Sequence, residues 1–243
     1  MNITAFGLQR LSPALVATAA AVLGLPSHAA LITTSASNSA MAVDAAFVNG
    51  ITGTGDFLDA PYQEPAAGNQ TALNLGRFQG REQRPVFAFQ LPAIPVGEEL
   101  VAADLRFSTV FDRSNPQFGG DLEAIGVRGS GTIQISDYQA AGTLIEDDAL
   151  FTGIADFSSH TLGGSGEAAL LNYLTTNYQA GDFVFLRFTF DAAPPEGDYY
   201  ALFAHSSSAA PELQLTTEVI PEPASLALVA AGLGLTMTRR GRG

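Results

Sequence analysis

Short runs that alternate between apolar and polar side chains fill the chain from residue 30 to residue 219, separated by glycine, proline, asparagine and aspartate. The clearest runs are 84–91, in which Phe87, Phe89 and Leu91 share one side, and 100–110. A period of two places successive side chains on opposite faces of a strand. The pattern therefore predicts antiparallel sheets with one buried face.

Further strands are expected at residues 31–35, 42–48, 71–78, 122–127, 132–136, 183–190, 199–205 and 213–218. The run 183–190 is apolar at nearly every position, so we expect a central strand with both faces covered. One helix is expected from Ser165, as its N-cap, to Gly181, with Leu170, Leu171 and Leu174 in an apolar stripe. About ten strands in one domain predict an all-β fold, a β-sandwich of jelly-roll type with one short helix.

The first 29 residues have the pattern of a secretory signal peptide. Arg10 precedes an apolar run at residues 14–25, and Ser27 and Ala29 are small residues of the kind that signal peptidase accepts before the cleaved bond. A buried core helix is the alternative, but so short a run followed by Pro26 favours export. We expect cleavage after Ala29, which leaves a β-sandwich domain at residues 30–219.

Residues 220–243 form a second targeting pattern. An acid between two prolines opens it and arginines close it: Pro221, Glu222, Pro223, Arg239, Arg240 and Arg242. The uncharged stretch between them, residues 224–238, would span about 22 Å as a helix, which is short against a hydrocarbon core of about 30 Å. We therefore expect a transient inner-membrane anchor whose arginines face the cytoplasm.

This order of Pro-Glu-Pro, short apolar stretch and arginine-rich end resembles the PEP-CTERM sorting signal of Gram-negative bacteria, over residues 219–243. The resemblance implies recognition by an inner-membrane exosortase, removal of the tail, and delivery to the cell surface or the extracellular matrix. It is found in organisms that often produce exopolysaccharide and form biofilms. An ordinary C-terminal transmembrane helix is the alternative, and it would not require the Pro-Glu-Pro.

Two parts of the domain also resemble DNRLRE-type domains. The first extends from Leu75-Gly76-Arg77 through residues 84–91 to residues 101–107, and the second joins residues 200–205 to residues 211–215. Those domains are jelly rolls, similar to carbohydrate-binding modules, on secreted bacterial proteins and polysaccharide-degrading enzymes. The middle of the domain is not matched and the motif that names the family is absent. The resemblance implies a jelly roll and makes extracellular polysaccharide the expected ligand.

Charge and composition exclude several classes of protein. The chain has 11 arginines, no lysine and 24 acidic residues, a formal net charge of −13. Between residues 30 and 220 seven arginines stand against 23 acids, a net charge of −16. This charge repels phosphate backbones, so we expect no nucleic-acid partner. Without cysteine the chain has no disulfide, thiol nucleophile or thiolate metal site.

Candidate ligand residues are aromatic side chains near loops and arginines near a strand. Sugar rings stack on aromatic faces, and Tyr62 and Tyr138 lie in or beside predicted loops. Arg77, Arg81 and Arg84 precede an apolar run, where they could bind an acidic sugar or pair with neighbouring carboxylates.

Calcium is the one cofactor that the sequence favours. Oxygen-bearing side chains gather on one long predicted turn: Asp112, Asn115, Asp121 and Glu123. Asp56 and Asp59 form a second candidate loop. Neither group follows the EF-hand spacing, and solvated loop acids are the alternative.

Catalytic motifs are absent from the sequence. No Gly-x-Ser-x-Gly occurs, and His160 and His205, the histidines after the signal peptide, stand on separate segments. We therefore expect a non-enzymatic, exported surface or matrix protein that binds exopolysaccharide. A structural or adhesive biofilm protein without glycan specificity is one alternative, and a secreted polysaccharide hydrolase or lyase is the other.

Overall fold

A computed structural model describes residues 29–45, 55–112, 119–151, 153–192 and 194–220. Ser27, Asn115 and the whole sorting segment lie outside these residues, as does the side chain of Asp112. The strands are β1 (Ala30–Ser35), β2 (Asn38–Asp44), β3 (Phe57–Asp59), β4 (Tyr62–Glu64), β5 (Gln70–Phe78), β6 (Arg81–Gln90), β7 (Glu98–Asp112), β8 (Gly120–Arg128), β9 (Thr143–Leu150), β10 (Ser159–His160), β11 (Phe183–Thr189), β12 (Tyr199–Phe203) and β13 (Glu212–Val219). The helix α1 (Gly164–Asn177) and two 3₁₀ turns, η3 (Pro65–Ala67) and η4 (Ile135–Tyr138), complete the described part.

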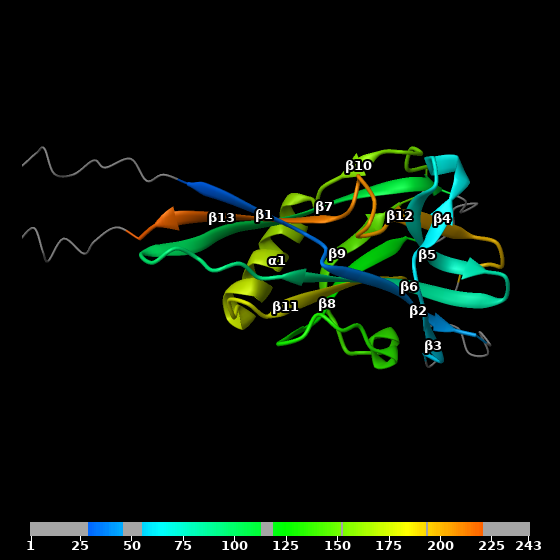
Figure 1. The fold of residues 1–243 in the computed structure, drawn as a ribbon, viewed down its shortest axis with the longest axis horizontal. Coiled ribbons are helices and arrows are strands. Elements are labelled where there is room, and N and C mark those ends of the chain that lie inside the picture. Colours follow the sequence, from blue (N-terminus) through cyan, green and yellow to red (C-terminus); the bar gives the residue numbers. More distant parts are fainter. Residues whose placement is uncertain (1–28, 46–54, 113–118, 152, 193, 221–243) are drawn as a thin grey trace, which may run out of the picture.

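The fold is an all-β sandwich of jelly-roll type, built from one large, curled antiparallel sheet with one α-helix (Figure 1). The main path of the sheet is β1-β13-β7-β12-β5-β6-β11-β8-β9. The long strand β7 joins the two layers, because its first part pairs with β13 and its last part with β12. Strand β2 pairs with the remaining edge of β6. The all-β expectation is confirmed.

One hydrophobic core lies between the layers. Phe188 of β11 packs edge-on against Phe87 of β6 and Phe107 of β7, with ring-centroid distances of 6.1 and 5.1 Å. All three rings are almost fully buried. Each such ring contributes roughly 2–3 kcal/mol through burial of apolar surface, so these contacts hold the layers together.

The predicted central strand is confirmed. β11 pairs with β6 on one side and β8 on the other, and all but its first residue are buried. The expectation of one water-facing side fails for β6, where Val86 and Ala88 on the second face are also buried. They pack against Ile133 and Tyr138, because the segment that includes η4 covers this face.

Residues 132–136 do not form the expected strand. They lie in a loop that enters η4, where the Asp137 carboxylate accepts from the backbone N–H of Gln134 at 2.8 Å. The carbonyls of Asp137 and Tyr138 accept from Arg187 Nη1 at 2.7 and 2.8 Å. Because Arg187 donates to these two carbonyls, their hydrogen bonds are formed without a partner strand. The expected strands did not include β9, nor β4, which contains Tyr62.

The helix is confirmed and its start is corrected. α1 begins after Gly163, not Ser165, and no local side chain caps it. Glu146 of β9 supplies the cap instead, because its Oε1 accepts from the Gly163 N–H at 2.9 Å. Leu170 and Leu174 are buried as expected, and α1 contacts β7 and β9. Among the described residues no helix has the length and hydropathy needed to cross a bilayer.

The first and last strands of the domain, β1 and β13, lie side by side. β1 pairs with β13, with Ala30 opposite Thr217. In Figure 1 this pair occupies one end of the long axis, and β3 and β4 lie at the other end. Ala30 and Val219 therefore lie at the end of the domain opposite to β4.

Candidate ligand site

A hollow of about 300 Å³, here called the Tyr62 pocket, opens beside β4 and the β5–β6 hairpin. Aromatic, amide and charged side chains line it together: Tyr62, Phe78, Tyr199, Asn74, Gln79, Gln83, Asp59, Glu64 and Arg81. Tyr62 and Arg81 are two of the five ligand residues predicted from the sequence. The structure brings these two together from separate strands.

Tyrosine and phenylalanine rings form one wall of the pocket. The Tyr62 hydroxyl donates to Asn74 Oδ1 at 2.8 Å, which fixes the ring. Burial, with help from the nearby Glu64 carboxylate, raises the pKa of Tyr62, so the phenol stays neutral. Phe78 and Tyr199 pack with their ring centroids 4.9 Å apart. The wall is therefore rigid and apolar with a polar edge, as sugar-binding surfaces require.

An unsatisfied amide lies among the buried residues of the pocket. Gln83 is only 5% exposed, and its Oε1 has no hydrogen-bond partner. Asn74 and Met41 beside it are equally buried, each 4% exposed. An unpaired buried acceptor costs roughly 1–3 kcal/mol, and such groups are rare in folded proteins. A ligand hydroxyl or amine that donated to Gln83 would remove this cost.

Gly76 holds the two sides of the pocket together. It pairs with Tyr199 of β12 and also with Gln83 of β6. Its φ of +127° is one that L side chains rarely adopt, and a Cβ there would lie 2.5 Å from the Asp198 carbonyl oxygen. Only glycine permits this crossing of β5 from one partner strand to the next.

The arginines near the pocket are paired with acids. Arg81 Nη1 lies 3.7 Å from Asp59 Oδ2, and both side chains are more than 40% exposed. Arg77 Nε lies 3.0 Å from Glu196 Oε2. In the structure both arginines therefore pair with carboxylates, which is the second of the two roles that the sequence allowed. Such exposed pairs add little stability.

Tyr138 and Arg84, two further candidates, lie inside the protein. Tyr138 is fully buried and its hydroxyl donates to Glu82. Arg84 donates to Glu82 Oε1 from Nε and Nη2 at 3.0 and 2.7 Å, and its guanidinium lies 4.3 Å from the Tyr138 ring centroid. Burial raises the pKa of the Glu82 carboxyl even so. These side chains hold η4 against the sheet.

Of the predicted calcium residues, the structure describes the side chains of Asp121 and Glu123. Glu123 is paired with Arg187, whereas Asp121 lies with Asp147 and Asp191, their carboxylate oxygens all within 4.8 Å of one another. Burial, with the neighbouring charges of Asp191 and Asp147, raises the pKa of Asp121 to about 6. Calcium at Asp112, Asn115, Asp121 and Glu123 stays a prediction. Asp147 and Asp191 carried no sequence signal, because they are distant in the chain.

Asp56 and the two histidines all make hydrogen bonds within the protein. Asp56 Oδ2 accepts from the Ala45 N–H at 2.9 Å. His160 Nε2 lies 2.7 Å from Ser158 Oγ, and burial lowers the pKa of His160. His205 Nδ1 lies 2.7 Å from Ser39 Oγ, in a separate pair.

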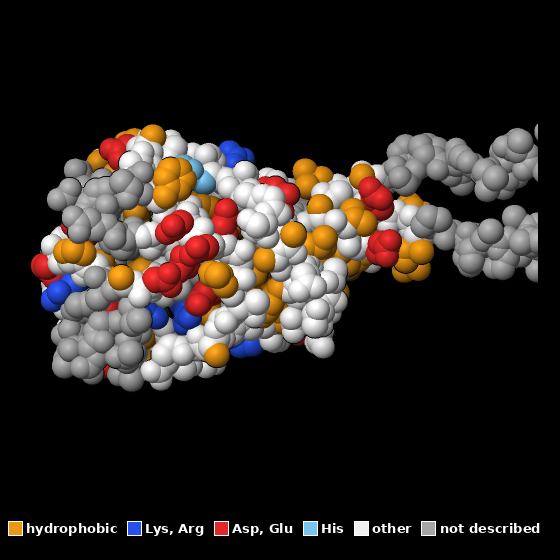
Figure 2. Space-filling view, turned by 180° about the vertical axis from the view of Figure 1, so that it is seen from behind, with side chains coloured by type: hydrophobic (Ala, Val, Ile, Leu, Met, Phe, Trp, Pro, Cys, Tyr) orange, Lys and Arg blue, Asp and Glu red, His pale blue; other side chains and the backbone are white. Residues whose placement is uncertain are grey.

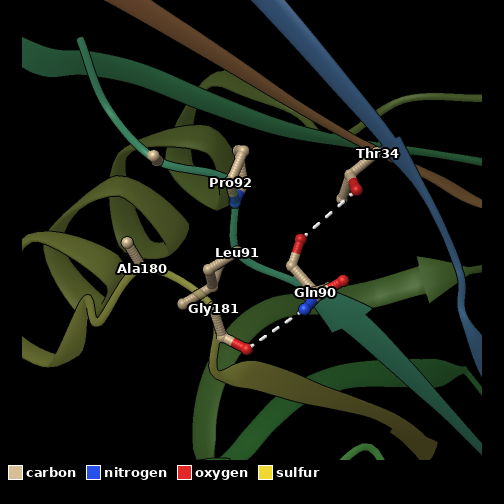
Figure 3. A pocket seen from close by; sticks show the side chains of 7 residues that line it. Thr34, Gln90, Leu91, Pro92, Ala180 and Gly181 are labelled. Atoms are coloured by element: carbon tan, nitrogen blue, oxygen red, sulfur yellow. Dashed lines mark hydrogen bonds between the residues drawn. The ribbon is translucent and has the colours of Figure 1, made fainter.

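A second hollow, of about 410 Å³, lies beside the end of β6 (Figure 3). Its polar groups already bond one another: Thr34 Oγ1 donates to the Gln90 carbonyl, and Gln90 Nε2 to the Gly181 carbonyl, each at 3.3 Å. No aromatic or charged side chain lines it among the described residues. The Tyr62 pocket is the better candidate for a ligand site.

No family model matches the chain, and no curated protein matches it significantly. The candidate function therefore depends on the targeting patterns of the sequence and on the chemistry of the Tyr62 pocket.

Proposed function

We propose that the protein is a non-enzymatic surface or matrix protein, exported and sorted by a PEP-CTERM signal, whose β-sandwich binds extracellular polysaccharide in the Tyr62 pocket. The observation that supports this function is the buried, unpartnered Gln83 Oε1 beside an aromatic wall. A sugar ring offers a partner for each of these features. Its apolar face can stack on Tyr62, and its hydroxyl groups can donate to Gln83.

The size and position of the pocket support the same proposal. A hollow of about 300 Å³ is at the lower end of the range for small-ligand sites, so it suits one sugar unit of a longer polymer. The pocket lies beside β4, at the other end of the long axis from the β1–β13 pair (Figure 1). A domain attached through its C-terminal segment would present the pocket away from the membrane.

Replacing Tyr62 with alanine is expected to weaken binding of the producer's exopolysaccharide about tenfold, because stacking on the ring is lost. Binding is measured with the exported protein by titration calorimetry, and Tyr62→Phe should retain most of the affinity. Phe151→Ala, which removes an aromatic ring that is 53% exposed and outside the pocket, is the matched control.

Three outcomes would contradict this function. Equal affinity of the Tyr62→Ala protein and the wild type would remove the pocket from the interaction. Adhesion that soluble polymer does not compete with would favour a structural matrix protein without glycan specificity. Release of new reducing ends would identify a polysaccharide hydrolase.

The export route is tested separately. Mass spectrometry of protein collected outside the cell should show a chain that begins at Ala30 and lacks the arginine-rich end. Changing Pro221 and Pro223 to alanine should leave the tail uncleaved and the protein in the cell envelope. Extracellular wild-type protein with residues 221–243 intact would refute the sorting assignment.

A further inference from the structure

Three lining residues of the Tyr62 pocket offer hydrogen-bond acceptors: Gln83, Tyr62 and Glu64. Gln83 Oε1 has no donor, and the Tyr62 oxygen can accept because its proton goes to Asn74. Glu64 contributes a carboxylate, of which Oε1 accepts from the Ala66 N–H at 3.0 Å. A carboxylate can accept several hydrogen bonds and donates none. The pocket therefore fits a ligand that is rich in donors.

The charges that line the pocket favour the same ligand. Arg81 is the one cation among its lining residues, and it lies 3.7 Å from Asp59. Of the charged residues that line the pocket, Arg81 and Asp59 neutralise each other, and Glu64 leaves one negative charge. Figure 2 shows acidic side chains grouped on one face of the domain, and residues 30–220 carry a net charge of −16. Such a field attracts cationic polymers and repels polyanions before contact.

We propose, building on the polysaccharide-binding function above, that the Tyr62 pocket selects amino sugars with a protonated amino group over neutral sugars and over uronates. An ammonium group is a compact donor of three hydrogen bonds with no acceptor. It therefore complements the acceptors among the lining residues, Gln83 Oε1, Tyr62 Oη and Glu64. A uronate carboxylate would place acceptor against acceptor and charge against like charge.

Three hexasaccharides of equal length test this specificity: a glucosamine oligomer, its fully N-acetylated counterpart, and oligogalacturonate. The exported protein should bind the free-amine oligomer at least tenfold more tightly than the acetylated one, with the oligogalacturonate weakest. Glu64→Gln should remove most of this preference, because the free-amine oligomer then loses its carboxylate partner in the pocket. Glu99→Gln removes an exposed acid outside the pocket and should keep the preference. It makes the net charge less negative by one unit, as Glu64→Gln does.

Failure of the specificity is distinguishable from failure of the function. Equal affinity for the free-amine and acetylated oligomers, or tighter binding of the oligogalacturonate, would overturn the amino-sugar inference and leave polysaccharide binding intact. The inference also fails if Glu99→Gln reduces the preference as much as Glu64→Gln, because the selectivity would then come from net charge. Absence of binding to these oligomers and to the producer's exopolysaccharide would overturn both proposals.

Discussion

Replacing Arg187 with alanine is expected to lower the free energy of unfolding by about 3 kcal/mol or more. The Arg187 side chain is 5% exposed, and Nη2 donates to Glu123. Nη1 donates to the carbonyls of Asp137 and Tyr138 at 2.7 and 2.8 Å. Without the guanidinium, the partly buried Glu123 carboxylate and the buried Asp137 carbonyl lose this donor, and the Tyr138 carbonyl keeps only Arg84 Nη1.

Urea unfolding followed by circular dichroism measures this loss. Arg106→Ala is the matched control, because Arg106 is 52% exposed and its Nη1 lies 3.7 Å from Glu212. Exposed pairs contribute about 0–1 kcal/mol, so the control should unfold nearly as the wild type does. Similar losses for both variants would show that the buried arginine does not secure the η4 segment.

Removing the charge of Asp121 should change how stability depends on pH. The pKa of this carboxyl is about 6 in the folded protein against an ordinary value of 3.8. Between these values the folded state binds more protons than the unfolded state, so the free energy of unfolding falls as pH rises. The contribution reaches about 3 kcal/mol above pH 6. Asp121→Asn should therefore match the wild type near pH 3.5 and exceed its stability at pH 7.5.

Thermal unfolding across this pH range, with and without calcium, tests both the titration and the cation. Calcium should raise the Tm of the wild type at pH 7.5, which is above the pKa of Asp121, and should not act on Asp121→Asn. Glu99→Gln, which removes an exposed carboxyl, should follow the wild type. Identical pH profiles for Asp121→Asn and the wild type would contradict the titration, and an unchanged Tm would contradict the calcium prediction.

Sequence periodicity predicted most of the strands because alternation is a local property. In β6, Phe87 and Phe89 face the core as their spacing requires, and the apolar run of β11 lies at the centre of the sheet. Periodicity could not show that a loop covers the second face of β6. That cover depends on Arg84, which donates to the Tyr138 carbonyl 54 residues away at 3.1 Å.

At the candidate site too, the sequence identified residue types, and only contacts between distant residues decided their roles. Tyr62 and Tyr138 look alike in the sequence, yet one lines a hollow and the other is fully buried. Gln83 carried no sequence signal, since its unpaired oxygen matters only after Gly76 brings β6 beside Tyr199.

The sequence by itself determined the all-β class, the core-facing positions of the strands and the acidic charge, and it supplied both targeting patterns. These properties depend on neighbouring residues or on composition. The tertiary structure alone decided which tyrosine meets solvent, which acids gather around Asp121, and where a buried acceptor goes without a donor. Each of these depends on contacts between residues far apart in the chain, which the register of the strands fixes only when the sheet closes.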